Sequence, residues 1–256
     1  MKRTRFVTAA VLAVLVLGLL SPGIIERIAD RSGVGDTLVV EPIADLSTAE
    51  TLPVALLDRL QSDETLSTLE LDAGRNYTTA DAAQRAALLT EGYLERCGLP
   101  VKYEELYLPD RWETQPLIVM PETPDTAGWN AVLWNCTCRA QGYHAGGCLF
   151  DDTSGAPLAI YLLLPVSVLD QFDLPEQSDV CAAVFADMLG ADFYAADPEQ
   201  VPENAAADKY DLYGSFSYGI IDEKGNTTVI WVTWQFADVD PESGEDLVLL
   251  WVGMEE

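Results

Sequence analysis

Three stretches of the chain carry apolar residues at the spacing of an amphipathic helix. In the second stretch, for example, Ala82, Leu89 and Tyr93 fall on one side of the helix. Each stretch starts beside a threonine or serine that can cap the first turn, and a glycine follows the second and the third. The predicted helices cover residues 51–61, 78–97 and 178–189, with Thr51, Thr78 and Ser178 as the expected caps.

Shorter segments show strand patterns, either as alternation of apolar and polar residues or as a continuous apolar run. The predicted strands are residues 101–108, 116–120, 129–138, 158–164, 211–221, 227–237 and 246–252. The last three predict a C-terminal antiparallel meander, because turn-forming residues separate them. Residues 65–72 fit a helix or a strand, residues 139–147 predict a turn, and residues 191–208 predict a long surface loop. Because helices and strands segregate along the chain, we expect an α+β fold with about three helices and an antiparallel sheet.

The N-terminal residues 6–25 carry no charge, and Lys2, Arg3 and Arg5 precede them. A helix of about 20 apolar residues spans the hydrocarbon core of a bilayer. Residues 1–25 are therefore a retained transmembrane signal anchor or a cleaved signal peptide. The lack of an Ala-x-Ala cleavage site favours the anchor. The basic residues in front of the apolar run favour a cytoplasmic N-terminus.

This orientation divides the remaining chain into two parts. Residues 26–46 mix both signs of charge with glycine and proline, which predicts a juxtamembrane linker. Residues 47–256 form the expected folded domain, and the hydrophobic content of 49% is enough for a sizeable core. We therefore expect a single-pass membrane protein with an extracytoplasmic domain, which is secreted if the N-terminal segment is cleaved.

The chain is strongly acidic, with a formal net charge of −28, and its 42 acidic residues all follow residue 25. Such a body repels the phosphates of nucleic acids and anionic lipid surfaces. We therefore expect no nucleic-acid partner, whereas a protein or cationic partner remains compatible with the charge. Solubility of an exported domain explains the acidic side chains without any partner.

The densest group of metal-binding residue types is Cys136, Cys138, His144 and Cys148, and His144 is the sole histidine of the chain. These residues make a complete ligand set for structural zinc, but a single residue between the paired cysteines is too short for the usual zinc spacing. In an exported chain, a disulfide of Cys148 with Cys136 or Cys138 is the stronger interpretation.

The two remaining cysteines, Cys97 and Cys181, fall on the apolar faces of the second and third predicted helices. Their positions are typical of buried thiols in a core. Five cysteines cannot all form pairs, so at least one is free or bonds to another molecule.

Sequence patterns for catalysis and cofactor binding are missing. The chain lacks the Gly-x-Ser-x-Gly, His-Glu-x-x-His, P-loop and Gly-x-Gly-x-x-Gly patterns, and we expect neither catalytic residues nor a cofactor. Paired carboxylates such as Asp151 and Asp152, or Glu104 and Glu105, keep a hydrolase as the alternative. The leading hypothesis is a membrane-tethered module for binding, sensing or surface structure, and a redox or zinc role of residues 136–148 is a third.

Overall fold

The computed structural model of the chain describes residues 52–61, 65–100, 102–121, 129–140, 143–195, 212–239 and 244–254. All of them belong to one compact unit, Ser47–Glu256. The expected signal anchor (1–25) and linker (26–46) lie outside the described residues. None of the helices in the described residues combines the length and the hydrophobicity needed to cross a membrane.

The unit is built on one nine-stranded sheet in which all neighbouring strands are antiparallel. The strand order is β1-β2-β3-β4-β5-β9-β8-β7-β6, so β5 lies at the centre. The strands are β1 (Leu66–Glu70), β2 (Trp112–Pro121), β3 (Ala131–Ala140), β4 (Tyr143–Asp151), β5 (Pro157–Pro165), β6 (Ala191–Ala195), β7 (Leu212–Asp222), β8 (Thr227–Val239) and β9 (Asp246–Gly253). This architecture of helices with a large antiparallel sheet confirms the predicted α+β class, and β7, β8 and β9 form the predicted meander.

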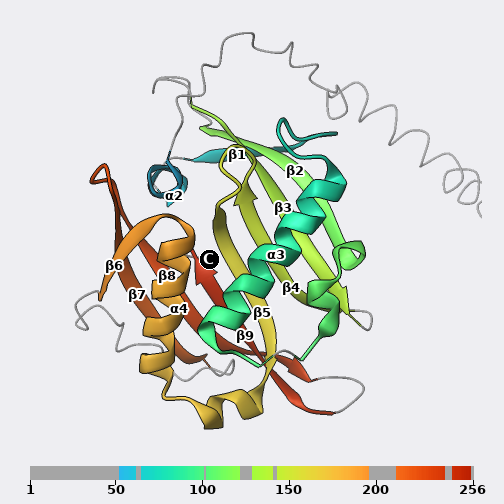
Figure 1. Cartoon of the computed structure of the whole chain (residues 1–256), viewed down its shortest axis with the longest axis vertical. Helices are drawn as coiled ribbons and strands as arrows, with labels where there is room; N and C mark the ends of the chain where they lie inside the picture. Colours follow the sequence, from blue (N-terminus) through green and yellow to red (C-terminus); the bar gives the residue numbers. More distant parts are fainter. Residues whose placement is uncertain are drawn as a thin grey trace, which may run out of the picture. The chain divides into compact units, whose positions relative to one another are not determined.

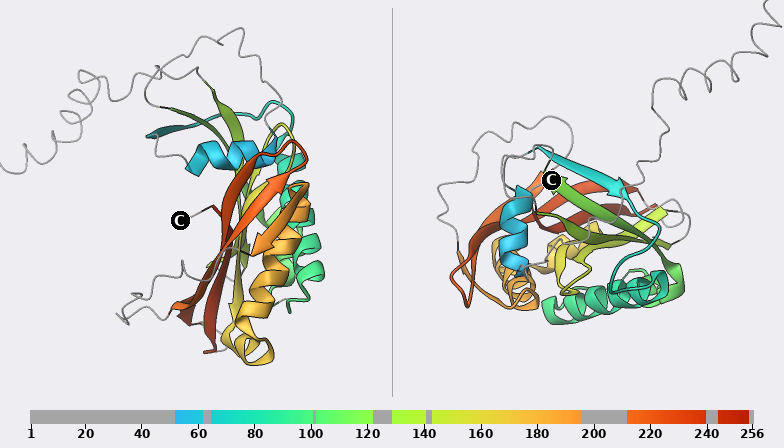
Figure 2. Two further views of the ribbon diagram at one scale, coloured as in Figure 1. Left: turned by 90° about the vertical axis from the view of Figure 1, so that its left-hand side faces the viewer. Right: turned by 90° about the horizontal axis from the view of Figure 1, so that it is seen from above.

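Two long helices lie on the same face of the sheet (Figures 1 and 2). The first, α3 (Thr79–Cys97), contacts β2, β3 and β4, and the second, α4 (Leu174–Met188), contacts β6, β7, β8 and β9. A shorter helix, α2 (Pro53–Gln61), contacts β8 and β7. We call the face of the sheet opposite α3 and α4 the open face.

The described part of the chain contains the same arrangement two times, a helix and a meander of four antiparallel strands. The first half contains α3 and β2 to β5, and the second contains α4 and β6 to β9. The last strands of the two halves, β5 and β9, pair with each other and join the meanders into one sheet. The repeat left no visible trace in the sequence, because the two halves share helix and strand periods but not residues.

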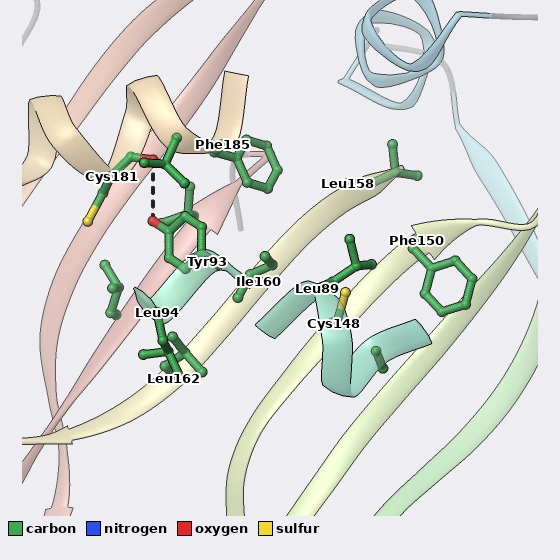
Figure 3. Close-up of a cluster of buried hydrophobic side chains, with 14 of the residues drawn as sticks. Leu89, Tyr93, Leu94, Cys148, Phe150, Leu158, Ile160, Leu162, Cys181 and Phe185 are labelled. Carbon is green, nitrogen blue, oxygen red and sulfur yellow. Dashed lines mark hydrogen bonds between the residues drawn. The ribbon is translucent and has the colours of Figure 1, made fainter. Parts of the chain in front are cut away.

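The core lies between the sheet and the helices α3 and α4. Central strand β5 buries Leu158, Ile160, Leu162 and Leu164, which alternate toward the helices as expected for a half-covered strand. Figure 3 shows part of this cluster, with Leu89, Tyr93 and Phe185 from the two helices. Two fully buried indoles have hydrogen-bond partners, since Trp134 donates to Asp152 and Trp234 donates to Ser178.

Helix α3 begins and ends as its sequence predicts. Thr78 and Asp81 form a reciprocal capping box, and Gly98 adopts the left-handed conformation that closes the helix. Helix α4 differs from the prediction, because it starts at Leu174 with Asp173 as the cap. Ser178 is inside the helix and buried, where its Oγ accepts a hydrogen bond from Trp234 Nε1 at 2.9 Å.

The strand predicted at residues 101–108 is wrong. The segment instead forms two short 3-10 helices, Glu104–Tyr107 and Pro109–Arg111. Its inward-facing residues, Tyr103 and Leu106, are three positions apart, which is the period of a 3-10 helix and not of a strand. The ambiguous segment at residues 65–72 contains strand β1.

Two predicted connections contain strands. Strand β4 covers residues 143–147 of the turn expected at residues 139–147. Gly146 and Gly147 belong to this strand, and neighbouring side chains occupy the space that a Cβ would need at either position. A Cβ at Gly147 would overlap the ring of Tyr161 on neighbouring β5. The loop expected at residues 191–208 begins with edge strand β6, and the rest of that segment lies outside the described residues.

Candidate functional site

The cysteines of the predicted cluster lie side by side in the sheet beneath α3. Cys136 on β3 and Cys148 on β4 are direct partners in the antiparallel register, and Cys138 is opposite Gly146. All three are buried and carry free thiols. The sequence left open which cysteine faces Cys148, and the strand register selects Cys136. A disulfide between these two residues stays a prediction.

The side chain of His144 is exposed, whereas the three thiols are buried. The residue lies on β4 near the β3–β4 hairpin, opposite Arg139. His144 therefore lies on a strand, although it belongs to the segment 139–147 for which a turn was predicted. Among the residues that the structure describes, no group of three or more His, Cys, Asp or Glu side chains could hold a metal ion.

The environment of the three thiols determines their reactivity. Burial raises the pKa of Cys136 to about 12 and contributes most to the same shift of the Cys138 pKa, to about 12. Burial also raises the pKa of Cys148 well above its usual value. Because the thiolate is the reactive form of cysteine, we expect these thiols to react slowly near neutral pH in the folded protein.

The structure reveals a second pair of thiols that the sequence placed separately in the core. Cys97 at the end of α3 and Cys181 on α4 both contact the side chain of Gln177. Gln177 Nε2 donates to the carbonyl oxygen of Cys97 at 2.8 Å and contacts Cys181 Sγ at 3.8 Å. Tyr93 OH donates to the carbonyl oxygen of Cys181 at 3.4 Å, as the dashed line in Figure 3 shows.

The adjacent carboxylates that could serve a hydrolase hold the backbone in place. Asp151 accepts hydrogen bonds from the backbone N–H and the hydroxyl of Ser154, which close the turn after β4. Asp152 is fully buried and points to a different segment, where it accepts from the N–H groups of Arg75 and Asn76. Glu104 and Glu105 lie on the first 3-10 helix, with Glu104 exposed.

The open face carries a band of partly exposed side chains that crosses the sheet. Tyr161 on β5 and Trp251 on β9 are register partners, and their rings stack with centroids 6.0 Å apart and planes at 8°. Trp251 Nε1 donates to the carbonyl oxygen of Met254 at 2.8 Å, which fixes the indole. On the other side of Trp251, Thr233 hydrogen-bonds with Ser215 at 2.9 Å.

Further apolar side chains extend this band along the strands. Leu163 and Leu249 are register partners next to the stacked rings, and Trp231 lies two residues before Thr233 on β8. All of them are partly exposed. The open-face band consists of Tyr161, Leu163, Trp231, Thr233, Leu249 and Trp251.

Sequence reasoning missed the open-face band, because Tyr161 and Leu163 belong to an apolar run that predicts a strand buried on both faces. The sequence does show one part of the band, because Leu249 and Trp251 alternate with core residues along β9. It does not show that β9 pairs with the apolar run of β5. Periodicity alone does not say which strands are neighbours.

Comparisons with protein families, curated proteins and solved structures found no match to this chain.

Proposed function

We propose that the chain is a membrane-tethered extracytoplasmic binding module and that it binds a protein partner through the open-face band. The observation that carries the proposal is the stacked pair Tyr161 and Trp251, which stays partly exposed at the centre of the sheet. Tyrosine and tryptophan are enriched at protein interfaces and dominate their binding energy, because each offers a large, rigid contact area. The hydroxyls of Thr233 and Ser215 add polar contacts beside the rings.

The charge of the chain indicates the chemistry of the partner. A net charge of −28 attracts a protein whose contact surface has basic residues around an apolar centre. Because such attraction acts mainly on the encounter rate, we expect association to slow as the salt concentration rises.

The tether is supported by the N-terminal sequence. The uncharged residues 6–25 behind Lys2, Arg3 and Arg5 favour a helix in the membrane with the acidic body outside the cytoplasm. A tag fused after Glu256 tests this orientation. Protease added outside intact cells should remove the tag, and a tag that is lost only after lysis would reject the extracytoplasmic placement.

Oxidative footprinting of aromatic side chains tests the binding surface. The full chain is labelled with hydroxyl radicals in its native membrane and, in parallel, after purification in detergent. We expect Trp251, Trp231 and Tyr161 to be labelled several-fold less in the native membrane, because a bound partner shields them. Tyr107 on the first 3-10 helix is the control, since it is partly exposed and this helix packs against α3 on the opposite side of the sheet.

A pair of matched variants tests whether the protection comes from the open face. Thr233→Arg places a cation in the open-face band, where a basic partner is repelled, and should raise labelling of Trp251 in the native membrane to the level of the purified chain. Leu88→Arg adds the same side chain at an exposed position of α3 and should leave the protection intact. Equal labelling of Trp251 and Tyr161 in the membrane and in detergent would reject the proposed surface.

A further inference from the structure

Cys97 and Cys181 meet where the two helix-and-meander halves of the chain contact each other. Cys97 is the last residue of α3, and Cys181 lies at the middle of α4. Both residues contact Gln177 Nε2, and they are 4% and 0% exposed. The two cysteines are therefore neighbours, although they are far apart in the sequence.

The surrounding polar groups hold both cysteines in place. One nitrogen atom, Nε2 of Gln177, contacts the carbonyl oxygen of Cys97 and the sulfur of Cys181. Tyr93 OH binds the carbonyl oxygen of Cys181 from α3. Each helix thus contributes a side chain that binds the other helix beside its cysteine, which fixes the approach of the two thiols.

We propose that Cys97 and Cys181 form a disulfide that joins α3 to α4 when the chain folds under oxidising conditions. A disulfide needs two cysteines on backbones a few ångströms apart. The shared contact with Gln177 Nε2 places the sulfur of Cys181 beside the backbone of Cys97, and the packing of α3 on α4 holds the two backbones together.

The bond forms by thiol–disulfide exchange with a small disulfide such as oxidised glutathione. The Cys181 thiolate attacks one sulfur of glutathione disulfide, which forms a mixed disulfide and releases one glutathione thiolate. The Cys97 thiolate then attacks the sulfur of Cys181 and releases the second. Two protein thiols are oxidised, one glutathione disulfide is reduced to two thiols, and the protons of the cysteines pass to the leaving thiolates.

Either thiol can make the first attack, because both routes give the same disulfide. Because both side chains are buried in the folded protein, the exchange takes place before α3 and α4 have fully docked.

The pairing also accounts for the odd number of cysteines. Cys136 and Cys148 are register partners in the sheet, and Cys97 and Cys181 both contact Gln177. If both pairs form disulfides, Cys138 is the thiol without a partner. The disulfide between the helices would close a loop of about 85 residues. It would therefore constrain the unfolded chain more than a disulfide between Cys136 and Cys148 in the β3–β4 hairpin.

Peptide mapping of the refolded full chain tests the proposal. The reduced, unfolded chain is refolded into detergent micelles with a mixture of reduced and oxidised glutathione, and free thiols are then alkylated. Cleavage with trypsin and with a protease that cuts before aspartate isolates Cys97 in residues 97–102 and Cys181 in residues 179–186. We expect these two peptides to be recovered mainly as one disulfide-linked species.

Thermal unfolding supplies the second measurement. Adding reductant to the oxidised chain should lower Tm by on the order of 10 °C through loss of this bond. In a Cys97→Ser/Cys181→Ser variant, reductant should lower Tm by about 10 °C less than in the wild-type chain. In Cys138→Ser, reductant should lower Tm as much as in the wild-type chain. Recovery of residues 97–102 and 179–186 as separate alkylated peptides from the oxidised wild-type chain would overturn the proposal, even if the variants do not fold. The assay uses purified chain, so its result is independent of the membrane orientation and the binding surface proposed above.

Discussion

The indole nitrogen of Trp134 donates a hydrogen bond of 2.7 Å to the carboxylate of Asp152, and both side chains are completely buried. The same carboxylate accepts from the backbone N–H groups of Arg75 and Asn76, which lead into α3. One acidic side chain thus ties the connection before the helix to the end of β4 and to the core of the sheet.

Replacing Asp152 with alanine should lower the free energy of unfolding by about 3 kcal/mol or more. The substitution leaves the buried Trp134 N–H without its acceptor and removes the acceptor of two backbone N–H groups. Urea denaturation followed by tryptophan fluorescence measures the change. Asp110→Ala is the control, because Asp110 lies exposed on a short 3-10 helix. A variant at position 152 as stable as that control would contradict the anchoring role.

Two glycines should respond to alanine in opposite directions. A Cβ at Gly74 would lie 2.5 Å from the Trp134 ring and 2.6 Å from Asp152 Oδ1, so Gly74→Ala should destabilise the protein by about 1–3 kcal/mol. Gly92 lies inside α3 with open space around its Cβ position, so Gly92→Ala should stabilise by about 0.5–1 kcal/mol. The urea concentrations at the unfolding midpoints of Gly74→Ala and Gly92→Ala measure these changes. Equal midpoints would contradict the steric restriction at Gly74.

Thr90 on α3 is buried, and its hydroxyl finds no hydrogen-bond partner among the described residues. Valine has the same shape without the hydroxyl, so Thr90→Val should raise the free energy of unfolding by roughly 1 kcal/mol. Thr228 is the matched control, because its Oγ1 accepts a hydrogen bond from Gln61. Thr228→Val should be neutral or destabilising in the same urea experiment, and a loss of stability in Thr90→Val would reveal a partner for the hydroxyl.

The buried thiol of Cys136 should make the reduced protein sensitive to alkali. Burial raises its pKa to about 12, whereas an unfolded cysteine ionises near pH 8.5. A raised pKa in the folded state gives stability that is fully present below the unfolded pKa and is lost as pH rises toward the folded value. Above pH 9 this loss should approach about 1.4 kcal/mol per pH unit for this thiol.

Urea unfolding at pH 8 and at pH 10.5, with reductant present, measures the alkaline loss. The loss should shrink in a Cys136→Ala variant, which no longer carries this thiol. Rapid alkylation of Cys136 in the native protein at pH 8 would contradict the burial effect, because a thiol with this raised pKa has almost no thiolate at that pH.

The parts of the fold that the sequence predicted are those controlled by local interactions. The capping box at Thr78 and the left-handed glycine at position 98 define α3 from neighbouring residues alone. The β7–β8 hairpin was predicted for the same reason, since Asp222 accepts from the N–H groups of Lys224 and Asn226 within the turn.

The missed features depend on residues distant in sequence. Ser178 resembled a helix cap, but its hydroxyl binds Trp234 from a strand formed later in the chain. Gly147 resembled a turn residue, but it sits in a strand because the ring of Tyr161 covers it. The contact of Cys97 with Cys181 likewise follows from the docking of two helices, which neither helix encodes alone.

The pairing of β5 with β9 joins strands that are far apart in the order of synthesis. During synthesis, the central strand β5 keeps one edge without hydrogen bonds until β9, the last strand of the sheet, has left the ribosome. An apolar strand with an open edge is a template for association with other chains. The first half of the sheet therefore depends on a strand that follows it by about 80 residues to cover the edge of β5, and a chain that lacks β9 should be prone to aggregate.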